Sequence, residues 1–362
     1  MPSSINKISF AGALSNINSI TGVAKANINS ISASLLPSST YTSANSVFFD
    51  NTNDYGVING CVLPTDKGSI SFWLKLGQTM GTDIILHWSD LSTSGVFTNG
   101  FIDVRLQNNS GNPAARNIVF TYADGSSGQA RACSIKSSSS HHGTGFSRWK
   151  GNYDGVFGSW PDFEYNANKL IEPGTHSFSP AEGSEHGWHH FVVTWDVNET
   201  YVGKNAQSSH KFRPTASHNG TTTTHTGTMR IYMDGVLRNF GQSRYPSHNY
   251  QRTPTGMVEI SSNNLSEIGV MARPNSTLHT AGNMDDLACF NVKLSDAAVA
   301  AMYNSGTPTD LTTNSGNYTS SGNLIGYWKF DESSGTTIAD SSTNNNSMTL
   351  VNGPTWDNGD AP

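Results

Sequence analysis

The stretch GWHHFVVTWD (residues 187–196), followed by MRIYMDGVLR (229–238) and MDDLACFNVKLSDAAVAAMYNSG (284–306), decides the fold class of this chain. The first two phrases alternate apolar and polar residues, which is the pattern of strands with one face in a core. Asp234 and Gly235 favour a tight turn between strands, because both residue types tolerate a positive φ. The sequence therefore predicts a β-hairpin-rich protein.

The third phrase predicts a strand over residues 287–292 and then one short helix over 295–304. Ser295 is a suitable N-cap for that helix, and Ala298, Ala301 and Met302 follow it at helical spacing. A single short helix among many strands is compatible with an all-β architecture.

Together these phrases resemble the laminin-G-like, concanavalin-A-like jelly-roll domains found in phage and bacterial surface proteins. SVFFDNTNDY (46–55) also resembles the opening phrase of that family. The resemblance implies an all-β, antiparallel two-sheet jelly-roll sandwich over residues 46–310, interrupted by an insertion at about 125–185. Further alternating segments fit this spacing, at 69–76, 84–88, 101–106 and 117–122.

Composition excludes several classes of function. Charged residues make up 13% of the 362 positions, the net charge is −6 and no basic stripe occurs, so we expect no nucleic-acid partner. No apolar run reaches the length of a membrane span, and the first residues lack the pattern of a signal peptide. We therefore expect synthesis in a cytoplasm and no membrane partner. Of the three cysteines, Cys61 and Cys289 lie in predicted strands and are expected to be buried, and no disulfide framework is expected.

The first 36 residues differ in kind from the rest. Three near copies of an Ile-Asn-x-Ile unit place isoleucines at Ile5, Ile8, Ile17, Ile20, Ile28 and Ile31. Units this small do not bury a core alone. We interpret the segment as an assembly arm that docks on another protein or a sister subunit, with a disordered tail as the alternative. Residues 37–45 read as a linker.

The last segment, 311–362, contains LIGYWKF and SMTLV, which resemble the start of a further laminin-G-like repeat. One interpretation is a hairpin of these two strands added to the same sandwich. The other is a stub that pairs with a neighbouring chain. We favour the hairpin, because GYWKF makes a plausible edge strand that needs only one partner.

Acidic pairs raise the question of glycosidase chemistry, which uses two carboxylates facing one bond. None of the acidic pairs has the spacing of the glucanases that share this fold. Asp285 and Asp286 are adjacent, so in a regular strand they point to opposite faces. His189 and His190 likewise alternate, and one is expected to be buried and the other solvated. No spacing predicts a zinc site.

The resemblance implies a possible Ca²⁺ site, because related domains hold this ion with oxygen ligands on loops. The candidate ligands are Asp50, Asn51 and Asp54 in the opening phrase and Asp285 in the closing one. The alternative is that Asp50 and Asp285 cap turns through side-chain hydrogen bonds. No other cofactor is expected.

The insertion at 125–185 is rich in aromatic residues. Trp149, Tyr153, Trp160 and Tyr165 have the ring systems that stack on sugars or anchor in protein pockets, and His141 and His142 add polar groups. The alternative is a small core of their own beneath a long loop.

The order of arm, sandwich and tail resembles virion proteins of marine tailed phages. We therefore expect a non-enzymatic structural protein, either a capsid decoration or a tail appendage, located on the virion surface. Its expected partners are other virion proteins, sister subunits in a homo-oligomer, and host-surface glycan during attachment. The alternative is a bacterial carbohydrate-binding module or glycan-degrading enzyme.

Overall fold

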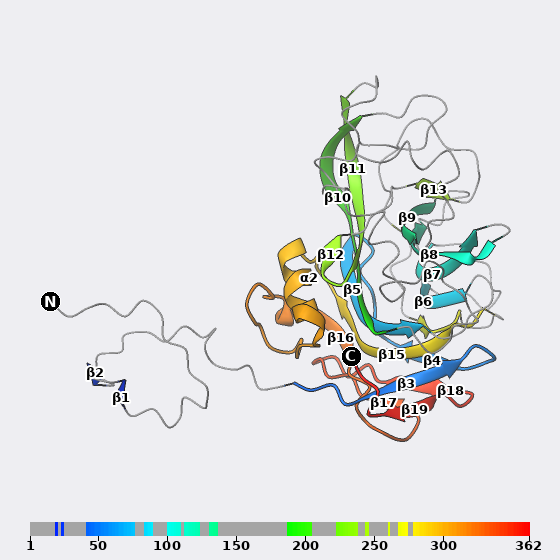
Figure 1. The fold of residues 1–362 in the computed structure, drawn as a ribbon. Helices are drawn as coiled ribbons and strands as arrows, with labels where there is room; N and C mark the ends of the chain where they lie inside the picture. The colour runs from blue at the N-terminus through cyan, green and yellow to red at the C-terminus, as the bar shows by residue number, and fades with distance from the viewer. Residues whose placement is uncertain are drawn as a thin grey trace. The chain divides into compact units, whose positions relative to one another are not determined.

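The computed structural model of the chain divides into two compact units, Met1–Tyr41 and Thr42–Pro362 (Figure 1). In the first unit the described strands are β1 (Ser19–Ile20) and β2 (Val23–Ala24), which pair antiparallel. The structure describes residues 19–20, 23–24, 41–76, 83–89, 100–109, 112–123, 130–136, 187–204, 222–237, 243–245, 260, 267–273 and 278–362.

The second unit is built on two antiparallel sheets, which confirms the predicted jelly-roll sandwich. The strands of the first sheet are β3 (Asn45–Asp50), β5 (Lys67–Leu76), β10 (His189–Lys204), β11 (Thr222–Met233), β12 (Val236–Leu237), β15 (Ala281–Phe290), β16 (Leu324–Trp328) and β19 (Thr355–Asn358). Their order is β12-β11-β10-β5-β15-β3-β19, and β16 pairs with β15 beyond the end of β3.

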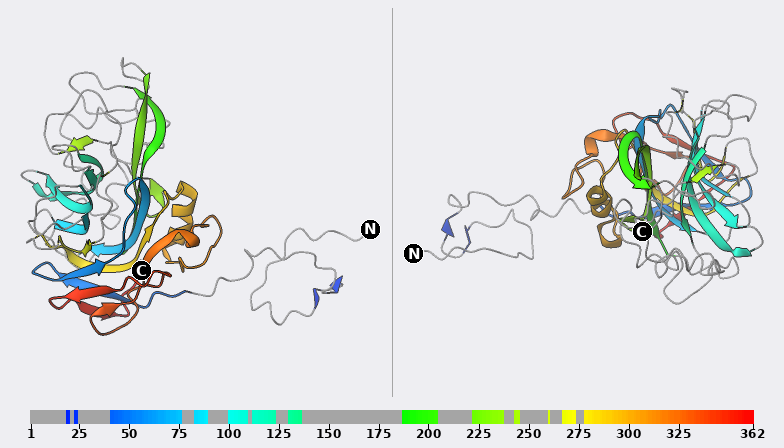
Figure 2. Two further views of the ribbon diagram at one scale, coloured as in Figure 1. Left: turned by 180° about the vertical axis from the view of Figure 1, so that it is seen from behind. Right: turned by 90° about the horizontal axis from the view of Figure 1, so that it is seen from above.

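The second sheet faces the first. Its strands are β4 (Tyr55–Asn59), β6 (Asp83–Ser89), β7 (Phe101–Asn109), β8 (Asn112–Ala123), β9 (Ala130–Lys136), β13 (Ser243–Tyr245), β14 (Glu267–Val270), β17 (Thr337–Ile338) and β18 (Met348–Val351). Their order is β13-β9-β8-β7-β6-β14-β4-β18-β17. Seen from above, the green strands β10 and β11 lie opposite the cyan strands of the second sheet (Figure 2).

The alternation seen in the sequence places one face of each strand in the core. Phe191 of β10 pairs with Met233 of β11 on one side and with Phe72 of β5 on the other, and all three side chains are buried between the sheets. Ile102 and Phe120 supply the facing layer from the second sheet. Period-2 patterning therefore accounts for the main core.

The predicted helix is present as α2 (Asp296–Tyr303). The Ser295 hydroxyl accepts a hydrogen bond from the backbone N–H of Ala298 at 3.1 Å, which confirms the N-cap. The helix ends where Asn304 adopts a left-handed φ of 44°, and the 3₁₀ turn η7 (Asn304–Gly306) follows. A second 3₁₀ turn, η8 (Ser321–Asn323), precedes β16.

Helix α2 covers a second, smaller hydrophobic core on the outer face of the first sheet. Val299 and Met302 of the helix pack there with Val192, Tyr232 and Phe290 of the sheet. The predicted turn at Asp234 and Gly235 also has positive φ values, 53° and 74°. A Cβ at residue 235 would lie 3.2 Å from Tyr303, so this glycine also allows the close approach of the helix.

The C-terminal segment corrects the predicted hairpin. The expected strands exist, but they belong to different sheets and do not pair with each other. Strand β16 pairs with β15 in the first sheet, whereas β18 pairs with β4 and β17 in the second. Strand β19 then adds to β3, so this segment contributes to both layers of the same sandwich.

Candidate functional site

The predicted ligand-binding residues lie outside the part of the chain that the structure describes. They are His141, His142, Trp149, Tyr153, Trp160 and Tyr165. Of the predicted arm residues, Ile20 lies in β1, whereas Ile5, Ile8, Ile17, Ile28 and Ile31 also fall outside the described residues. The interpretations of both groups stay predictions.

The four candidate calcium ligands divide into two places. The backbone N–H of Asp50 donates to Oδ2 of Asp54 at 3.3 Å, so these two carboxylates lie near each other beside Asn51. Ala281 of β15 is opposite Asp50, and Asp285 is four residues further along that strand, about 13 Å away at roughly 3.3 Å per residue. The structure therefore does not bring Asp285 to the opening loop.

The opening loop has the oxygen donors that Ca²⁺ prefers, but its carboxylates also serve the backbone. Oδ1 of Asp50 accepts from the N–H of Thr52 at 2.8 Å. Burial and the nearby charge of Asp50 raise the pKa of Asp54. Within the described residues, no group of three or more His, Cys, Asp or Glu side chains is arranged to hold a metal ion. A calcium site thus stays a prediction, and it rests on Asp50, Asn51 and Asp54.

Asp285 and Asp286 form a buried structural clamp. The hydroxyl of Ser43, just before β3, donates to Oδ2 of Asp285 at 2.5 Å, and the N–H of Asp286 donates to Oδ1 of Asp285 at 2.9 Å. The Tyr327 hydroxyl of β16 donates to Asp286. Burial raises the pKa of Asp285 and the charge of Asp286 raises it further, while the bond from Ser43 lowers it. These two carboxylates hold three chain segments together.

The local geometry of the clamp comes from an irregularity in β15. Asp286 has a φ of 47°, and the pairing of β15 with β5 shifts register between Asp285 and Ala288. A bulge of this kind redirects side chains from the regular alternation. Asp285 and Asp286 are 0% and 2% exposed, so neither carboxylate faces solvent.

The two histidines of the first phrase differ as expected. His190 is 2% exposed and its Nε2 lies 2.8 Å from the Ser71 hydroxyl, whereas His189 is partly exposed and its Nδ1 lies 2.8 Å from Asp234. The His190 ring also packs against Trp73 and Tyr303. Burial lowers the pKa of His190 to about 4, and Asp234 opposes this shift. At neutral pH His190 is therefore neutral.

A second polar cluster lies on the outer face of the second sheet and was not anticipated from the sequence. His87 and Asp103 are fully buried there, and Arg105 is 8% exposed. Nη1 of Arg105 lies 3.8 Å from Asp103, and its Nη2 donates to Thr121 at 3.3 Å. Burial lowers the pKa of His87 to about 3, with Arg273 and Arg105 adding to the effect.

The sequence signal for this cluster is misleading. His87 follows the core residue Leu86, and Asp103 lies between the core residues Ile102 and Val104. In a half-buried strand such positions are expected to face solvent. Their burial therefore comes from tertiary structure, and it cannot be recognised from the alternation of apolar and polar residues.

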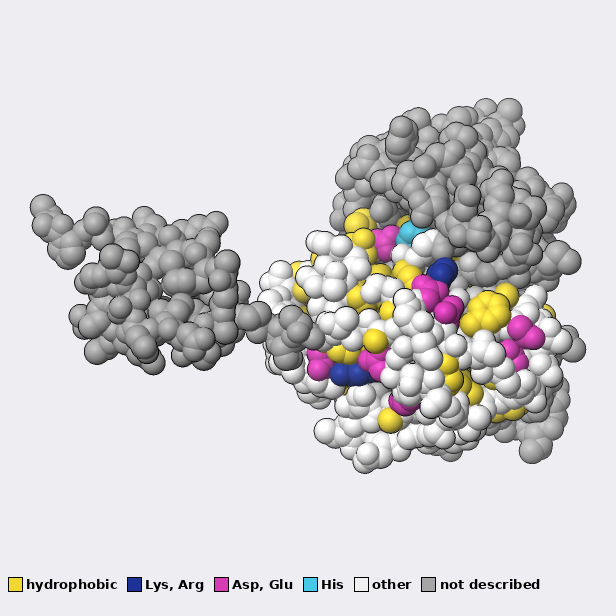
Figure 3. Space-filling model, turned by 60° about the horizontal axis from the view of Figure 1, so that its bottom comes forward, with side chains coloured by type: hydrophobic (Ala, Val, Ile, Leu, Met, Phe, Trp, Pro, Cys, Tyr) yellow, Lys and Arg dark blue, Asp and Glu magenta, His cyan; other side chains and the backbone are white. Residues whose placement is uncertain are grey.

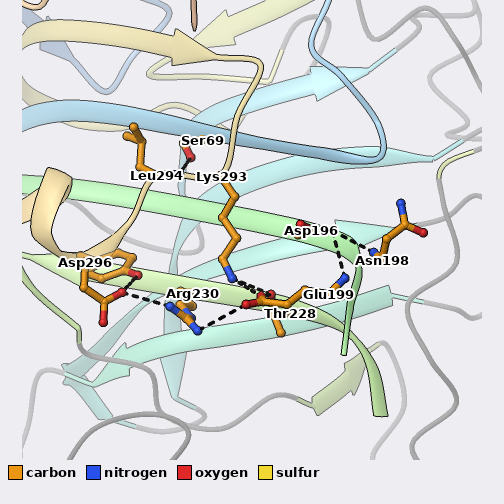
Figure 4. A network of polar contacts seen from close by, with 10 residues as sticks. Ser69, Asp196, Asn198, Glu199, Thr228, Arg230, Lys293, Leu294 and Asp296 are labelled. Carbon is orange, nitrogen blue, oxygen red and sulfur yellow. Dashed lines mark hydrogen bonds and ion pairs between the residues drawn. The ribbon is translucent and has the colours of Figure 1, made fainter. Parts of the chain in front are cut away.

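A third polar network fastens helix α2 to the first sheet (Figure 4). Lys293, which precedes the helix, donates to Glu199 of β10, and Thr228 of β11 also donates to Glu199. Arg230 donates to Asp296 in the first turn of α2 at 3.0 Å and lies 3.8 Å from Glu199. Two cations thus face two carboxylates. The network is balanced in charge, and its charged groups pair with one another.

The view in Figure 3 shows hydrophobic side chains in small patches between polar groups, with basic side chains beside acidic ones. No helix among the described residues has the length and hydropathy needed to cross a membrane.

Comparison with known proteins gives matches in structure alone. No protein-family model matches the chain, and no curated protein does. A candidate carbohydrate-binding protein from Bacteroides ovatus is similar with a TM-score of 0.43 and 13% identity, over 89% of this chain and 62% of that one. The heptameric SAP-like pentraxin from Limulus polyphemus gives 0.36 and 10%, over 73% and 84%. Domains LG4-5 of the mouse laminin α1 chain give 0.31 and 9%, over 68% and 41%.

The chain thus spans less than two thirds of the length of the Bacteroides protein. The class of this protein is defined by its own strand pairing. It is an all-β jelly roll whose two antiparallel sheets enclose one main core.

Proposed function

We propose that this chain is a non-enzymatic binding protein of a virion surface, with the sandwich as a rigid support and residues 1–36 as its anchor. The observation that carries the proposal is the clamp of Asp285 and Asp286. These two adjacent carboxylates are buried and bonded to Ser43 and Tyr327, so they act within the scaffold.

Glycoside hydrolysis requires a different arrangement of carboxylates. The two groups face a common substrate, with their carboxyls about 5–9.5 Å apart, and one of them holds a proton for the leaving group. Asp285 and Asp286 instead accept hydrogen bonds inside the protein and reach no surface. This use of the acidic pair favours a scaffold over a glycan-degrading enzyme.

The binding partner that we propose is a host-surface glycan. Its contacts would come from the aromatic insertion, where Trp149, Tyr153, Trp160 and Tyr165 supply rings for stacking and His141 and His142 supply polar groups.

The proposed anchor is the Ile-Asn-x-Ile segment. Met1–Tyr41 forms a unit separate from the sandwich, and a segment of this length is too short to bury a substantial core of its own. Docking on another virion protein or on a sister subunit would give its isoleucines an apolar environment. A homo-oligomer is the expected assembly.

Binding of the purified full chain to host polysaccharide tests the glycan partner. Trp149→Ala and Trp160→Ala should weaken binding at least tenfold, and Trp356→Ala, a partly exposed tryptophan on β19, should not. Release of sugar from the polysaccharide by the unmodified chain would contradict the non-enzymatic assignment.

Deletion of residues 1–36 tests the anchor. The truncated chain should stay folded, since the sandwich is a separate unit, and should no longer be recovered with purified particles. Recovery of the truncated chain in particles would contradict the role of the arm. Absence of the full chain from particles would contradict the virion location itself.

A further inference from the structure

Two of the three cysteines lie together in the main core of the sandwich. Cys61 follows β4 of the second sheet, and Cys289 lies in β15 of the first sheet. Both side chains are buried in the same hydrophobic cluster, at 1% and 0% exposure, and both are free thiols. We call Cys61 and Cys289 the thiol pair.

Strand β16 fixes the relative position of the thiol pair. Cys289 pairs directly with Gly326 of β16. The Cys61 thiol donates a hydrogen bond to the carbonyl oxygen of Ile325, the preceding residue, with an S···O distance of 3.7 Å. The Cys61 thiol also raises the pKa of the Cys289 thiol, as a near neighbour does. Both cysteines thus lie against the same stretch of β16, at Ile325 and Gly326, within the core between the two sheets.

The thiol pair lies a short way beneath the surface. Cys61 stands between Gly60, which is exposed, and Val62, which is 49% exposed. Strand β16 pairs with β15 on one side, and on the other it is covered by a short segment, where the Ser341 N–H donates to the Tyr327 carbonyl at 2.7 Å. The exposed residues on either side of Cys61 therefore give a small oxidant a short path to the sulfur atoms when the chain opens locally there.

We propose that Cys61 and Cys289 form an intramolecular disulfide under oxidising conditions, and that this bond locks the two sheets of the sandwich to each other. A small peroxide first oxidises one thiol to a sulfenic acid and releases water. The second sulfur then attacks that sulfur, one S–S bond forms, and a second water leaves. In total the two thiols lose two electrons and two protons, and the peroxide O–O bond is cleaved.

Closure of this bond would constrain the unfolded chain strongly. Residues 61 and 289 are 228 positions apart, so the bond closes a very long loop. The stabilisation from lost chain entropy increases with loop length. A protein made in a reducing compartment would thus be stabilised after its release into an oxidising one. The inference does not depend on glycan binding or on the arm.

The chemistry also sets the expected rate. Burial raises the pKa of the Cys289 thiol, and the neighbouring Cys61 thiol raises it further. Because the thiolate is the reactive form, a protonated buried thiol reacts slowly. The disulfide should therefore form over hours in the folded protein rather than within seconds.

The test uses the full chain, reduced and then incubated under native conditions with excess hydrogen peroxide or diamide. Remaining thiols are alkylated in denaturant, and the digest is analysed by mass spectrometry. We expect a peptide linking Cys61 to Cys289, with Cys133 alkylated. The Tm of the oxidised protein should rise on the order of 5 °C and return to its original value with dithiothreitol.

Two variants control the assignment. Cys133→Ser should form the same link and show the same rise in Tm, because it keeps the thiol pair. Cys61→Ser should show neither. Three free thiols after prolonged oxidation would overturn the proposal. So would a bond that involves Cys133 instead, or a link between Cys61 and Cys289 that forms only after the chain is unfolded.

Discussion

The hydroxyl oxygen of Ser71 on β5 lies 2.8 Å from Nε2 of His190 on β10, and the His190 ring packs against the rings of Trp73 and Tyr303. The hydrogen bond joins two central strands of the first sheet, and the ring contact with Tyr303 links them to the end of helix α2. The imidazole of His190 is 2% exposed and is neutral at physiological pH.

The lowered pKa of His190 predicts that the folded protein loses stability in acid. The ordinary pKa of His190 is 6.5 and burial lowers it to about 4 in the folded protein, so below pH 6.5 the unfolded chain binds a proton that the folded chain does not. Stability should therefore decrease as the pH falls from 6.5 towards 4, by on the order of 3 kcal/mol for this group. His87, whose pKa is lowered to about 3, acts in the same direction.

Urea unfolding at several pH values between 7 and 4 measures this effect. The variant His190→Gln should be less stable at neutral pH but should lose less stability on acidification. A pH profile parallel to that of the unmodified protein would show that His190 does not control the acid response.

The hydrogen bond from Tyr327 to Asp286 predicts that two tyrosine-to-phenylalanine substitutions will lower the free energy of unfolding by different amounts. Tyr327→Phe removes a hydrogen bond to a buried carboxylate and should cost about 1.5–3 kcal/mol. Tyr318→Phe removes a bond of 2.7 Å to the backbone carbonyl of Leu311, a neutral acceptor, and should cost about 1 kcal/mol. The comparison is made by measuring the free energy of unfolding of both variants in urea, provided that their m-values agree with that of the unmodified protein. Equal losses would indicate that the charge of Asp286 contributes nothing at this site.

Substitution of Gly326 is expected to destabilise the fold through a steric clash, and Gly322 provides a matched control nearby. A Cβ at residue 326 would lie 2.2 Å from Cη2 of Trp328, whose ring is fully buried and whose Nε1 donates to the carbonyl of Asn346 at 2.8 Å. Gly326→Ala should therefore cost about 2–4 kcal/mol or prevent folding. Gly322→Ala, which meets no atom within 4 Å, should change the Tm little. A tolerated Gly326→Ala would contradict the packing of Trp328.

Calcium binding predicts a shift in thermal stability that depends on the opening loop. If Asp50, Asn51 and Asp54 hold the ion, added Ca²⁺ should raise the Tm and EDTA should lower it, because a ligand that binds only the folded state stabilises it. Asp54→Asn should abolish the shift. Asp285→Asn should keep it, since Asp285 lies elsewhere along β15. A Tm that neither Ca²⁺ nor EDTA changes would refute the site.

The sequence by itself determined the elements whose causes are local. Alternating residues such as Ile70, Phe72 and Leu74 specify a strand with one apolar face, which packs in the core between the sheets. Ser295 specifies the start of α2, and Asp234 with Gly235 specifies the turn after β11. These signals operate over a few residues, so they can be recognised in the sequence without knowledge of the fold.

Only the tertiary structure decided which distant segments meet. Asn358 pairs with Asn45, and Asp285 receives its hydrogen bond from Ser43, at separations that no local pattern encodes. The C-terminal strands were predicted in place but assigned to each other, because periodicity identifies a strand and says nothing of its partner. The placement of Cys61 and Cys289 in one core cluster and the burial of Asp103 arise in the same way, from the packing of whole layers.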